Sequence, residues 1–412
     1  MFEFMDMGFD QASEAPVSGP YIPDAGECLR CGMCVSTCPT FRLFQTNEET
    51  PRSRIRTISK ILVENVAITA DERQHLDNCL QCRACETVCP SKMAYGELFD
   101  QARLKLEITP SWLGKLALGL IENKRWRMRL LPGLAVYLKS GLQKPLRRTG
   151  LLKKLGVAEA EALLGKPALK GLAGHYPAKI TKRGQVALFT GCIAEHFDQE
   201  TLQAAIKLLN SIGYDVTVPP QQGCCGAIHQ HNGQAAASLI ANNIAVFNAL
   251  EMDAVLHAAT GCGAMLSEYQ HEDAEAAGLF RQRLQDINAF LLAHWPDDQR
   301  LQALPKKVAV HEPCSQRNVL KNQQTVYNLL AKIPELEVAA LANNPLCCGA
   351  GGSYMLTHPD NAAQLRDLKR QAITAAQADW VVSSNFGCAV FLDVDADKVS
   401  HPLLILARQL PI

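Results

Sequence analysis

Short apolar runs alternate with longer amphipathic stretches throughout the second half of the chain. Runs such as residues 186–189 and 380–383 have the length of buried strands and end in polar or glycine-rich segments. Between the runs, apolar side chains recur three and four positions apart, which is typical of helices that cover a sheet. Strands that alternate with helices predict right-handed βαβ units and parallel sheets.

The same order of elements occurs twice, which indicates an internal duplication. Strands are expected at residues 186–189, 214–218 and 254–258, and again at 308–310, 336–340 and 380–383. Helices are expected at residues 198–212 and 233–250, and again at 323–332 and 360–376. We expect one α/β domain at residues 185–300 and its duplicate at residues 301–412.

The first part of the chain has a helical pattern instead. Helices are expected at residues 54–64, at 71–80 with Asp71 as N-cap, and at 95–108, where Pro110 follows. They predict a mostly helical domain over residues 27–110. Residues 1–26 are acidic and lack a basic region followed by an apolar run, so we expect a flexible arm rather than a secretory signal.

Eight cysteines in this helical part form two copies of the motif Cys-x2-Cys-x2-Cys-x3-Cys-Pro. In two-cluster ferredoxins with this spacing, three cysteines of a motif bind one [4Fe-4S] cluster and the fourth binds the other cluster. The predicted ligands of the first cluster are Cys28, Cys31, Cys34 and Cys89, and those of the second are Cys79, Cys82, Cys85 and Cys38.

Zinc and disulfides are the alternatives for these cysteines. A zinc site needs only four ligands, and two complete motifs that each end in Cys-Pro favour clusters over zinc. Disulfides fit poorly, because sixteen cysteines in mostly metal-type spacings indicate a reducing compartment. Arg52, Arg54 and Arg56 follow Pro51; the pattern favours a solvated helix start, with contacts near a cluster as the alternative.

Residues 111–184 are expected to form a basic helical linker. Residues 111–154 contain Glu122 as their single acidic residue, beside Trp112 and Trp126. Their eleven basic residues are Lys115, Lys124, Arg125, Arg127, Arg129, Lys139, Lys144, Arg147, Arg148, Lys153 and Lys154. Such a segment can lie on a membrane surface or bind an acidic partner, or pack on its own protein.

The overall composition limits the partners. Basic and acidic residues are equal in number at 41 each, so no nucleic acid is expected as a partner. No run reaches the roughly 18–20 apolar residues that span a bilayer. We therefore expect a cytoplasmic protein, peripheral on the inner face of the membrane.

The remaining eight cysteines follow predicted strands of the duplicated half, where ligands of parallel sheets bind. In each copy, four cysteines are expected to form one metal site. Gly226 and Gly349 follow the vicinal cysteine pairs and allow the backbone to turn sharply there. The third site comprises Cys192, Cys224, Cys225 and Cys262, and the fourth comprises Cys314, Cys347, Cys348 and Cys388. Inert buried cysteines are the alternative. The glycine runs lack a phosphate-binding or dinucleotide pattern, which disfavours nucleotide binding.

These repeated Cys-Cys-Gly motifs resemble the cysteine-rich CCG domains of heterodisulfide reductase subunits. About 385 of the 412 residues, including Pro51-Arg-x-Arg54, His311-x-Pro-Cys314 and Thr357-His-Pro-Asp360, are similar to the glycolate oxidase iron–sulfur subunit family. The chain departs from the heterodisulfide reductase pattern in one respect. Each motif there ends in Cys-x2-Cys, whereas Met265 and Phe391 stand at the last position here. The resemblance therefore favours ordinary four-cysteine clusters, or zinc, over a disulfide-cleaving double cluster.

The resemblance implies an α+β multidomain protein, with a helical two-[4Fe-4S] ferredoxin domain followed by two duplicated α/β CCG domains. It also implies an electron-transfer subunit of a 2-hydroxy-acid dehydrogenase for glycolate or D-lactate. An FAD-binding partner subunit would oxidise the substrate, and quinone or the respiratory chain would accept the electrons. The alternatives are a catalytic reductase acting at the CCG sites and an iron–sulfur subunit of a glycerol-3-phosphate or lactate dehydrogenase.

Overall fold

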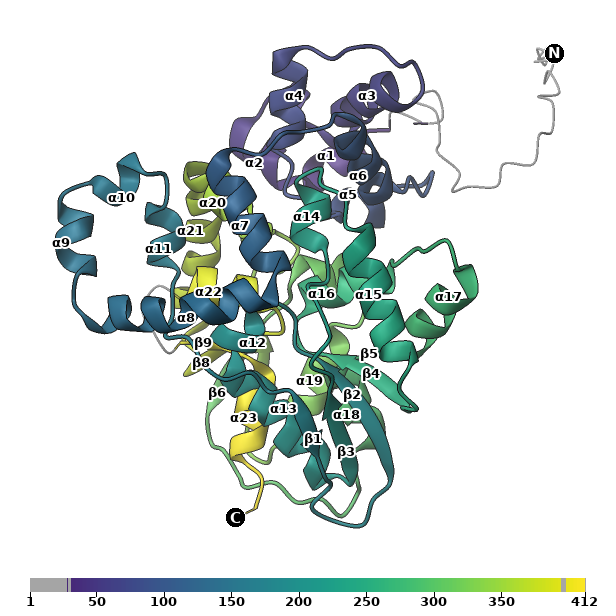
Figure 1. Ribbon diagram of the computed structural model, residues 1–412, viewed down its shortest axis with the longest axis vertical. Coiled ribbons are helices and arrows are strands. Elements are labelled where there is room, and N and C mark those ends of the chain that lie inside the picture. The colour runs from purple at the N-terminus through teal and green to yellow at the C-terminus, as the bar shows by residue number, and fades with distance from the viewer. Residues whose placement is uncertain (1–27, 29–30, 394–397, 412) are drawn as a thin grey trace, which may run out of the picture.

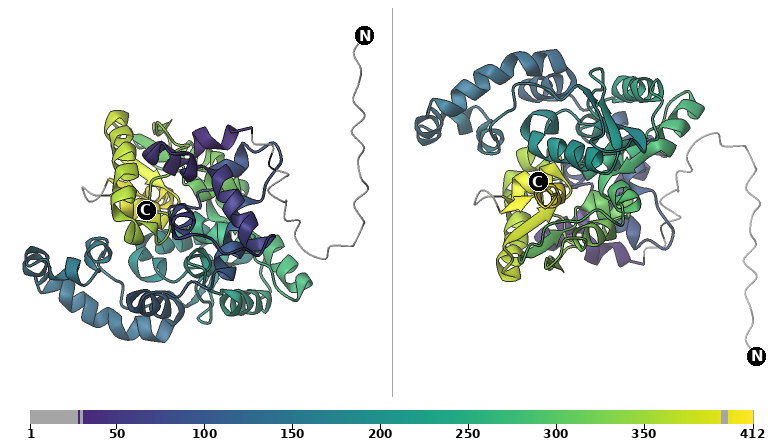
Figure 2. Two further views of the ribbon diagram at one scale, coloured as in Figure 1. Left: turned by 90° about the horizontal axis from the view of Figure 1, so that it is seen from above. Right: turned by 90° about the horizontal axis from the view of Figure 1, so that it is seen from below.

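The computed structural model describes residues 28, 31–393 and 398–411 of the chain (Figure 1). Helices α1–α6 form one end of the molecule, and two α/β units form the rest of the body (Figure 1). Helices α8–α11 extend from one side (Figures 1 and 2). The arm expected at residues 1–26 lies outside the described residues.

The first part is helical, as expected. Its helices are α1 (Met33–Thr37), α2 (Pro39–Phe44), α3 (Pro51–Leu62), α4 (Ala70–Asp77), α5 (Ala84–Thr87) and α6 (Tyr95–Lys105). Ile58 of α3, Leu76 of α4 and Phe99 of α6 belong to one buried apolar cluster. The expected cap of α4 was wrong: Thr69 caps the helix, because its side chain and that of Glu72 form a reciprocal capping box.

The linker residues form several short helices rather than one. They are α7 (Trp112–Glu122), α8 (Lys124–Lys139), α9 (Gln143–Arg148), α10 (Leu151–Lys154) and α11 (Ala158–Ala162). Lys124 anchors the start of α8 to the body through an ion pair of 2.9 Å with the buried Glu195. Among the described residues, no helix is long and apolar enough to cross a membrane.

Two sheets follow, and both are parallel apart from one edge strand. The first has the order β1-β3-β2-β4-β5 and the second the order β7-β6-β8-β9. The strands are β1 (Gly174–Tyr176), β2 (Gly184–Phe189), β3 (Tyr214–Val218), β4 (Ala254–His257), β5 (Leu284–Asp286), β6 (Lys307–His311), β7 (Glu337–Ala340), β8 (Trp380–Ser383) and β9 (Val399–Ser400). Without β1, the two sheets have the same strand order, as a duplication requires.

The strand β1 was not expected. It lies within the residues assigned to the linker, and it pairs with β3 in antiparallel orientation, from Gly174 opposite Val218 to Tyr176 opposite Val216. The short outer strands β5 and β9 were also missed, because neither contains a run of apolar residues. The other six strands coincide with the apolar runs to within two residues.

Helices cover both sheets. In the first repeat they are α12 (Ala194–Phe197), α13 (Gln199–Ser211), α14 (Ala227–His231), α15 (Ala237–Asn248), α16 (Thr260–Ser267), α17 (Ala274–Arg283) and α18 (Ile287–His294). In the second they are a π-helical turn (Ser315–Leu320), α19 (Gln324–Leu330), α20 (Tyr354–Thr357), α21 (Pro359–Ala376), α22 (Phe386–Leu392) and α23 (Pro402–Arg408). Strand β2 is buried on both faces, which explains its continuous apolar sequence.

The two repeats share one hydrophobic core. Helix α13 of the first repeat packs on α23 of the second, and α18 of the first packs on α19 of the second. Leu208 and Phe290 from the first repeat and Val326 and Leu406 from the second belong to the same buried cluster. The repeats are therefore fused along their helical faces.

Candidate iron–sulfur sites

The first cavity is lined by the four cysteines that the motifs assign to one cluster. Cys28, Cys31 and Cys34 come from the first motif and Cys89 from the second, and they surround a space of about 340 Å³ together with Arg52. Gly32 has a φ of 78°, a backbone conformation that glycine adopts without strain and that lets the loop turn between its cysteines. The structure thus brings together all four predicted residues.

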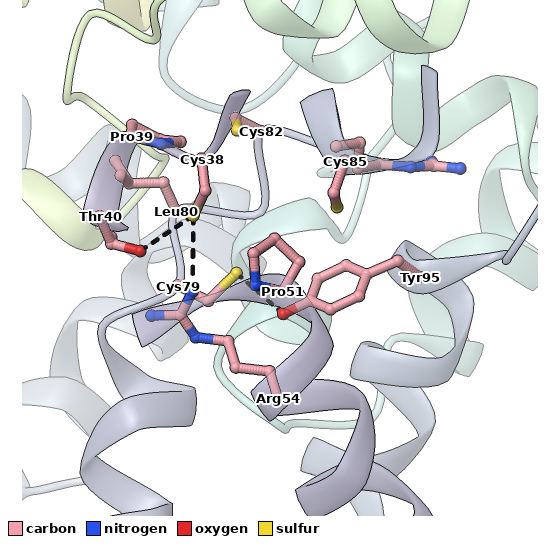
Figure 3. A pocket seen from close by; sticks show the side chains of 11 residues that line it. Cys38, Pro39, Thr40, Pro51, Arg54, Cys79, Leu80, Cys82, Cys85 and Tyr95 are labelled. Carbon is pink, nitrogen blue, oxygen red and sulfur yellow. Dashed lines mark hydrogen bonds between the residues drawn. The ribbon is translucent and has the colours of Figure 1, made fainter. Parts of the chain in front are cut away.

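The second cavity is lined by the other four ferredoxin cysteines (Figure 3). Cys79, Cys82 and Cys85 come from the second motif and Cys38 from the first, and they surround a space of about 300 Å³. The exchange of Cys38 and Cys89 between the motifs follows from the packing of α1 on α5. Within the described part of the chain, no three Cys, His, Asp or Glu side chains are placed to bind a single ion. Each set instead encloses a space that suits a polynuclear cluster.

Side chains around the second cavity point hydrogen-bond donors at its sulfurs. The Tyr95 hydroxyl donates to Cys79 Sγ at 3.4 Å, and the backbone N–H of Gln81 donates to the same sulfur at 3.4 Å. Arg54 Nη1 donates to Cys38 Sγ at 3.7 Å (Figure 3). Donors to sulfur stabilise the more negative, reduced state of a cluster and so raise its reduction potential.

Arg54 is 1% exposed, so the expectation of a solvated helix start was wrong for this residue. Its guanidinium forms an ion pair with the buried Glu49. Glu49 also binds His75 Nδ1 at 2.7 Å and accepts a hydrogen bond from Asn78 Nδ2 at 2.6 Å. Arg56, two positions along the same helix, is exposed. A buried ionic network therefore lies beneath the second cavity.

Burial dominates the protonation of the free thiols in this cavity. It raises the pKa of Cys82 and that of Cys85 well above the usual value, and the negative charge of neighbouring cysteines adds to the effect. Both thiols therefore favour the protonated form when no metal is bound. Since iron–sulfur clusters are bound by thiolates, loading this cavity with a cluster would release protons.

The third site lies at the carboxyl ends of β2 and β3 and on α16. Its vicinal cysteines, Cys224 and Cys225, are buried, and their loop is fixed by two side chains. Asn243 donates to the carbonyl oxygen of Cys224 at 2.9 Å, and the Tyr269 hydroxyl donates to that of Cys225 at 2.8 Å. Gly226 turns the loop with a φ of 90°. The pKa of Cys192 is raised well above its usual value by its hydrogen bond with Cys224 and by burial.

The fourth site occupies the same place in the second repeat. Cys348 Sγ lies 3.2 Å from Cys388 Sγ, and Asn385 Nδ2 donates to Cys388 Sγ at 3.2 Å. The pKa of Cys347 is lowered well below its usual value by hydrogen bonds from Cys314 and Cys348. The four predicted cysteines therefore come together here too.

Comparison with known proteins identifies the family. Residues 24–93 match the model of a 4Fe-4S dicluster domain, residues 186–267 and 308–393 match that of a cysteine-rich domain, and residues 109–164 match the linker region of the glycolate oxidase iron–sulfur subunit. The chain is 33% identical to the probable glycolate oxidase iron–sulfur subunit of Bacillus subtilis, over 91% of this chain and 90% of that one. The chain belongs to the glycolate oxidase iron–sulfur subunit family. It is also 32% identical to the glycolate oxidase iron–sulfur subunit of Escherichia coli, over 93% of each chain.

A solved structure supports the fold of this family member. A hypothetical protein from Helicobacter pylori superposes with a TM-score of 0.53 over 95% of this chain and 73% of that chain. The sequence identity of the pair is 10%, so the likeness concerns the fold alone.

Direct contacts link three of the four sites one after another, from the second cavity to the fourth site and from there to the third. Asn318, which follows Cys314 in the second repeat, donates to the carbonyl oxygen of Cys82 at 2.6 Å. Leu80 of the second cavity belongs to the same buried cluster as Cys347 and Cys348. Asn385 then joins the fourth site to the third, because its Oδ1 accepts the N–H of Gly261, next to Cys262, at 3.1 Å.

Sequence reasoning missed a pair of equivalent amide residues, one beside each repeat site. Gln222 accepts the Thr190 N–H at 2.8 Å and donates to the Leu188 carbonyl at 3.2 Å. Asn344 makes the equivalent pair of bonds in the second repeat, at 3.1 Å to the Glu312 N–H and 2.9 Å to the Val310 carbonyl. The two amides are 122 positions apart, as are Cys192 and Cys314, so aligning the repeats would have found them.

Proposed function

We propose that this chain carries electrons from a partner flavoprotein, which oxidises glycolate, toward quinone or the respiratory chain. Iron–sulfur clusters supply the one-electron carriers for such a task. The proposed ligands are the two ferredoxin sets and the two repeat sets described above. The observation that carries the proposal is the row from the second cavity through Asn318 to the fourth site and through Asn385 to the third.

The choice of glycolate rests on the relatives, two of which are named as glycolate oxidase iron–sulfur subunits. The partner would bind FAD, accept two electrons from the substrate, and pass them on one at a time. The task of this chain's own residues is to hold the ligand sulfurs, to direct hydrogen bonds at them and to exclude water. Buried Cys38, Cys224 and Cys348 are suited to that task.

The test is co-expression with the candidate flavoprotein, followed by purification through a tag on this chain. We expect a stable complex that reduces a quinone analogue with glycolate faster than with D-lactate or glycerol 3-phosphate. Co-purification of a flavoprotein that prefers D-lactate would change the proposed substrate from glycolate to D-lactate but leave the electron-transfer role intact. If the flavoprotein alone reduces quinone with glycolate as fast as the complex does, the electron-transfer role of this chain is overturned.

We further propose that helices α7–α10 bind the anionic surface of the cytoplasmic membrane. Trp126 is 52% exposed and Leu130 is 55% exposed, and both lie one turn apart on α8. Arg125 and Arg129 are exposed and adjoin this apolar stripe. Trp112, Leu116 and Val136 extend the exposed apolar side chains. Aromatic and aliphatic side chains beside basic ones are typical of helices that lie in a lipid headgroup layer.

Not every basic residue of this region is available to such a surface. Arg127 Nη1 donates to the carbonyl oxygen of Leu120 at 3.2 Å and to that of Ile121, so it caps the end of α7. Lys124 is paired with Glu195, and Arg147 is paired with Glu161 at 2.7 Å. The contacts with lipid would therefore come from the other exposed basic residues, such as Arg125, Arg129 and Lys139.

A further inference from the structure

Lys369 of α21 is a fully buried cation in the second repeat. Its side chain is 0% exposed, and its ammonium donates a hydrogen bond to the backbone carbonyl of Asn343, four residues before Cys347. Burying an ammonium without a negative partner costs several kcal/mol, so a charge of this kind requires compensation. A neutral carbonyl oxygen supplies only part of it.

The negative groups that act on Lys369 are the sulfurs of the fourth site. Burial lowers the pKa of Lys369, and the charges of Cys348, Cys347, Cys388 and Cys314 act in the opposite direction. The helix α21 also approaches the Cys-Cys-Gly loop closely. A Cβ at Gly349 would lie 2.6 Å from the carbonyl oxygen of Ala362, less than two turns before Lys369. The cation thus lies on the helix that packs directly against the ligand loop.

In the first repeat, the buried residue that contacts the ligand loop is neutral. There α15 presents Asn243, which is equally buried and bonds to the backbone of Gly223 and Cys224. The positive charge of Arg127, on α8, acts to lower the pKa of Cys192. The Arg127 side chain is partly exposed, and its Nη1 is bonded to the carbonyl oxygens at the end of α7, so water and the negative end of that helix weaken its field. The two repeat sites therefore differ in charge although their cysteines match.

We propose that Lys369 is the buried counter-charge of an iron–sulfur cluster held by Cys314, Cys347, Cys348 and Cys388, and that it makes this site easier to reduce than the site of the first repeat. The inference rests on the proposed electron-transfer function. A cluster gains negative charge when it is reduced, and a nearby cation in a low-dielectric interior stabilises that state. Lys369 thus acts on the cluster through its positive charge and is not a ligand. Because the fourth site also adjoins Cys82, it is the repeat site placed to exchange electrons with the ferredoxin part.

The experiment is a redox titration of the complete, anaerobically purified chain, followed by electron paramagnetic resonance. Cys348→Ser identifies the signal of the fourth site as the one that disappears. In Lys369→Met, the ratio of reduced to oxidised cluster in that signal at a fixed potential should fall at least tenfold, which corresponds to about 59 mV for one electron. The other signals should keep their potentials. Lys332→Met, which removes an exposed lysine of the same repeat, should leave every signal unchanged.

Several results would overturn the inference. An unshifted signal in Lys369→Met would show that the cation does not set the potential. An equal shift of all signals would show a general disturbance. If Lys369→Met cannot hold the cluster, Lys369→Arg decides: a cluster with the wild-type potential supports the counter-charge, and loss of the cluster there as well refutes it.

The same titration separates this inference from the proposed function. If Cys348→Ser removes no signal, the second repeat holds no cluster and the inference fails, whereas the ferredoxin part can still transfer electrons. If the potentials shift as expected but the complex does not reduce quinone with glycolate, the inference about Lys369 stands and the proposed function fails.

Discussion

The side chain of Asn318 holds the backbone carbonyl of Cys82 at 2.6 Å, and this single hydrogen bond spans the boundary between the ferredoxin part and the second repeat. The two residues are 236 positions apart in the sequence. Leu80 packs beside the same boundary, where a Cβ at Gly351 would lie 3.1 Å from its Cδ2 atom. The second cavity and the fourth site are therefore held at a fixed separation, as the proposed electron exchange between them would require.

This contact predicts that Cys82→Ser and Cys348→Ser have the same functional effect. In the assembled complex, each variant should lose about four of the irons bound by the wild type, since each loses one cluster. Glycolate oxidation should persist with an artificial acceptor that takes electrons at the flavin, and quinone reduction should fall at least tenfold. Loss of both activities would indicate failed assembly, and retention of both would assign the site a structural role. If the wild-type chain bound zinc instead of iron at these sites, the cluster assignment would be refuted.

A second prediction concerns the buried pair of Arg54 and Glu49. Arg54→Met leaves the Glu49 carboxylate buried without its cation, and breaking such a pair costs about 3–5 kcal/mol. Arg56→Met removes an exposed arginine of the same helix and should change the unfolding free energy by less than about 0.5 kcal/mol. Urea unfolding under anaerobic conditions, monitored by circular dichroism, measures both. Equal effects of the two substitutions would contradict a role for the buried network.

The membrane proposal predicts salt-sensitive binding to anionic vesicles. The complex should bind vesicles that contain phosphatidylglycerol at low ionic strength and dissociate above about 0.1 M salt, where the Debye length is roughly 10 Å. Arg125→Glu with Arg129→Glu should weaken binding at least tenfold. The matched control, Lys332→Glu with Lys398→Glu, makes the same change in net charge on exposed residues outside helices α7–α10. An equal loss in the control would show that only net charge matters, and no loss in either variant would contradict membrane binding by these helices.

The last prediction concerns pH and His401, which connects the two repeats. Its Nε2 donates to the carbonyl oxygen of Ala258 at 3.0 Å, and its Nδ1 accepts the N–H of Leu403 at 3.2 Å, so the folded state holds the neutral ring. Burial lowers the pKa of His401 to about 4. Below pH 6.5 the unfolded chain binds a proton that the folded chain does not, so stability falls as the pH drops from 6.5 toward 4.

Between pH 7 and pH 5 this histidine should cost about 2 kcal/mol of unfolding free energy. His401→Asn should remove that part of the pH dependence, although it is less stable at pH 7 because the bond to Ala258 is altered. His271→Asn changes an exposed histidine and should keep the wild-type dependence. Urea unfolding of the metal-free chain at both pH values tests this, and an unchanged slope in His401→Asn would contradict it.

Local sequence patterns predicted those parts of the fold that local interactions determine. The runs at residues 186–189 and 254–258 are buried on both faces, so their continuous apolar sequence was sufficient to identify them as strands. The cysteine spacing likewise predicted which thiols share a cavity, because a short loop limits where three neighbouring thiols can lie. The edge strands β5 and β9 escaped, since a strand of two or three residues leaves no period to detect.

What sequence reasoning could not supply depends on contacts between distant segments. Arg54 looked like an ordinary surface residue at the start of a helix, and only the fold shows that Glu49, His75 and Cys38 surround it. Lys369 lies in a helix with several other charged residues, so nothing in its neighbourhood marks it as buried. Asn318 and Asn385 are equally inconspicuous, because their partners lie more than a hundred positions away.

The shared core of the repeats has a consequence for symmetry. Helix α13 contacts α23 and its counterpart α19 contacts α18, which is the reciprocal pairing of elements found in a symmetric homodimer interface. In a homodimer of a single repeat, both sites would be identical, and any substitution would change both. Two repeats in one chain are free of that constraint, so one half has a buried lysine where the other has a neutral amide.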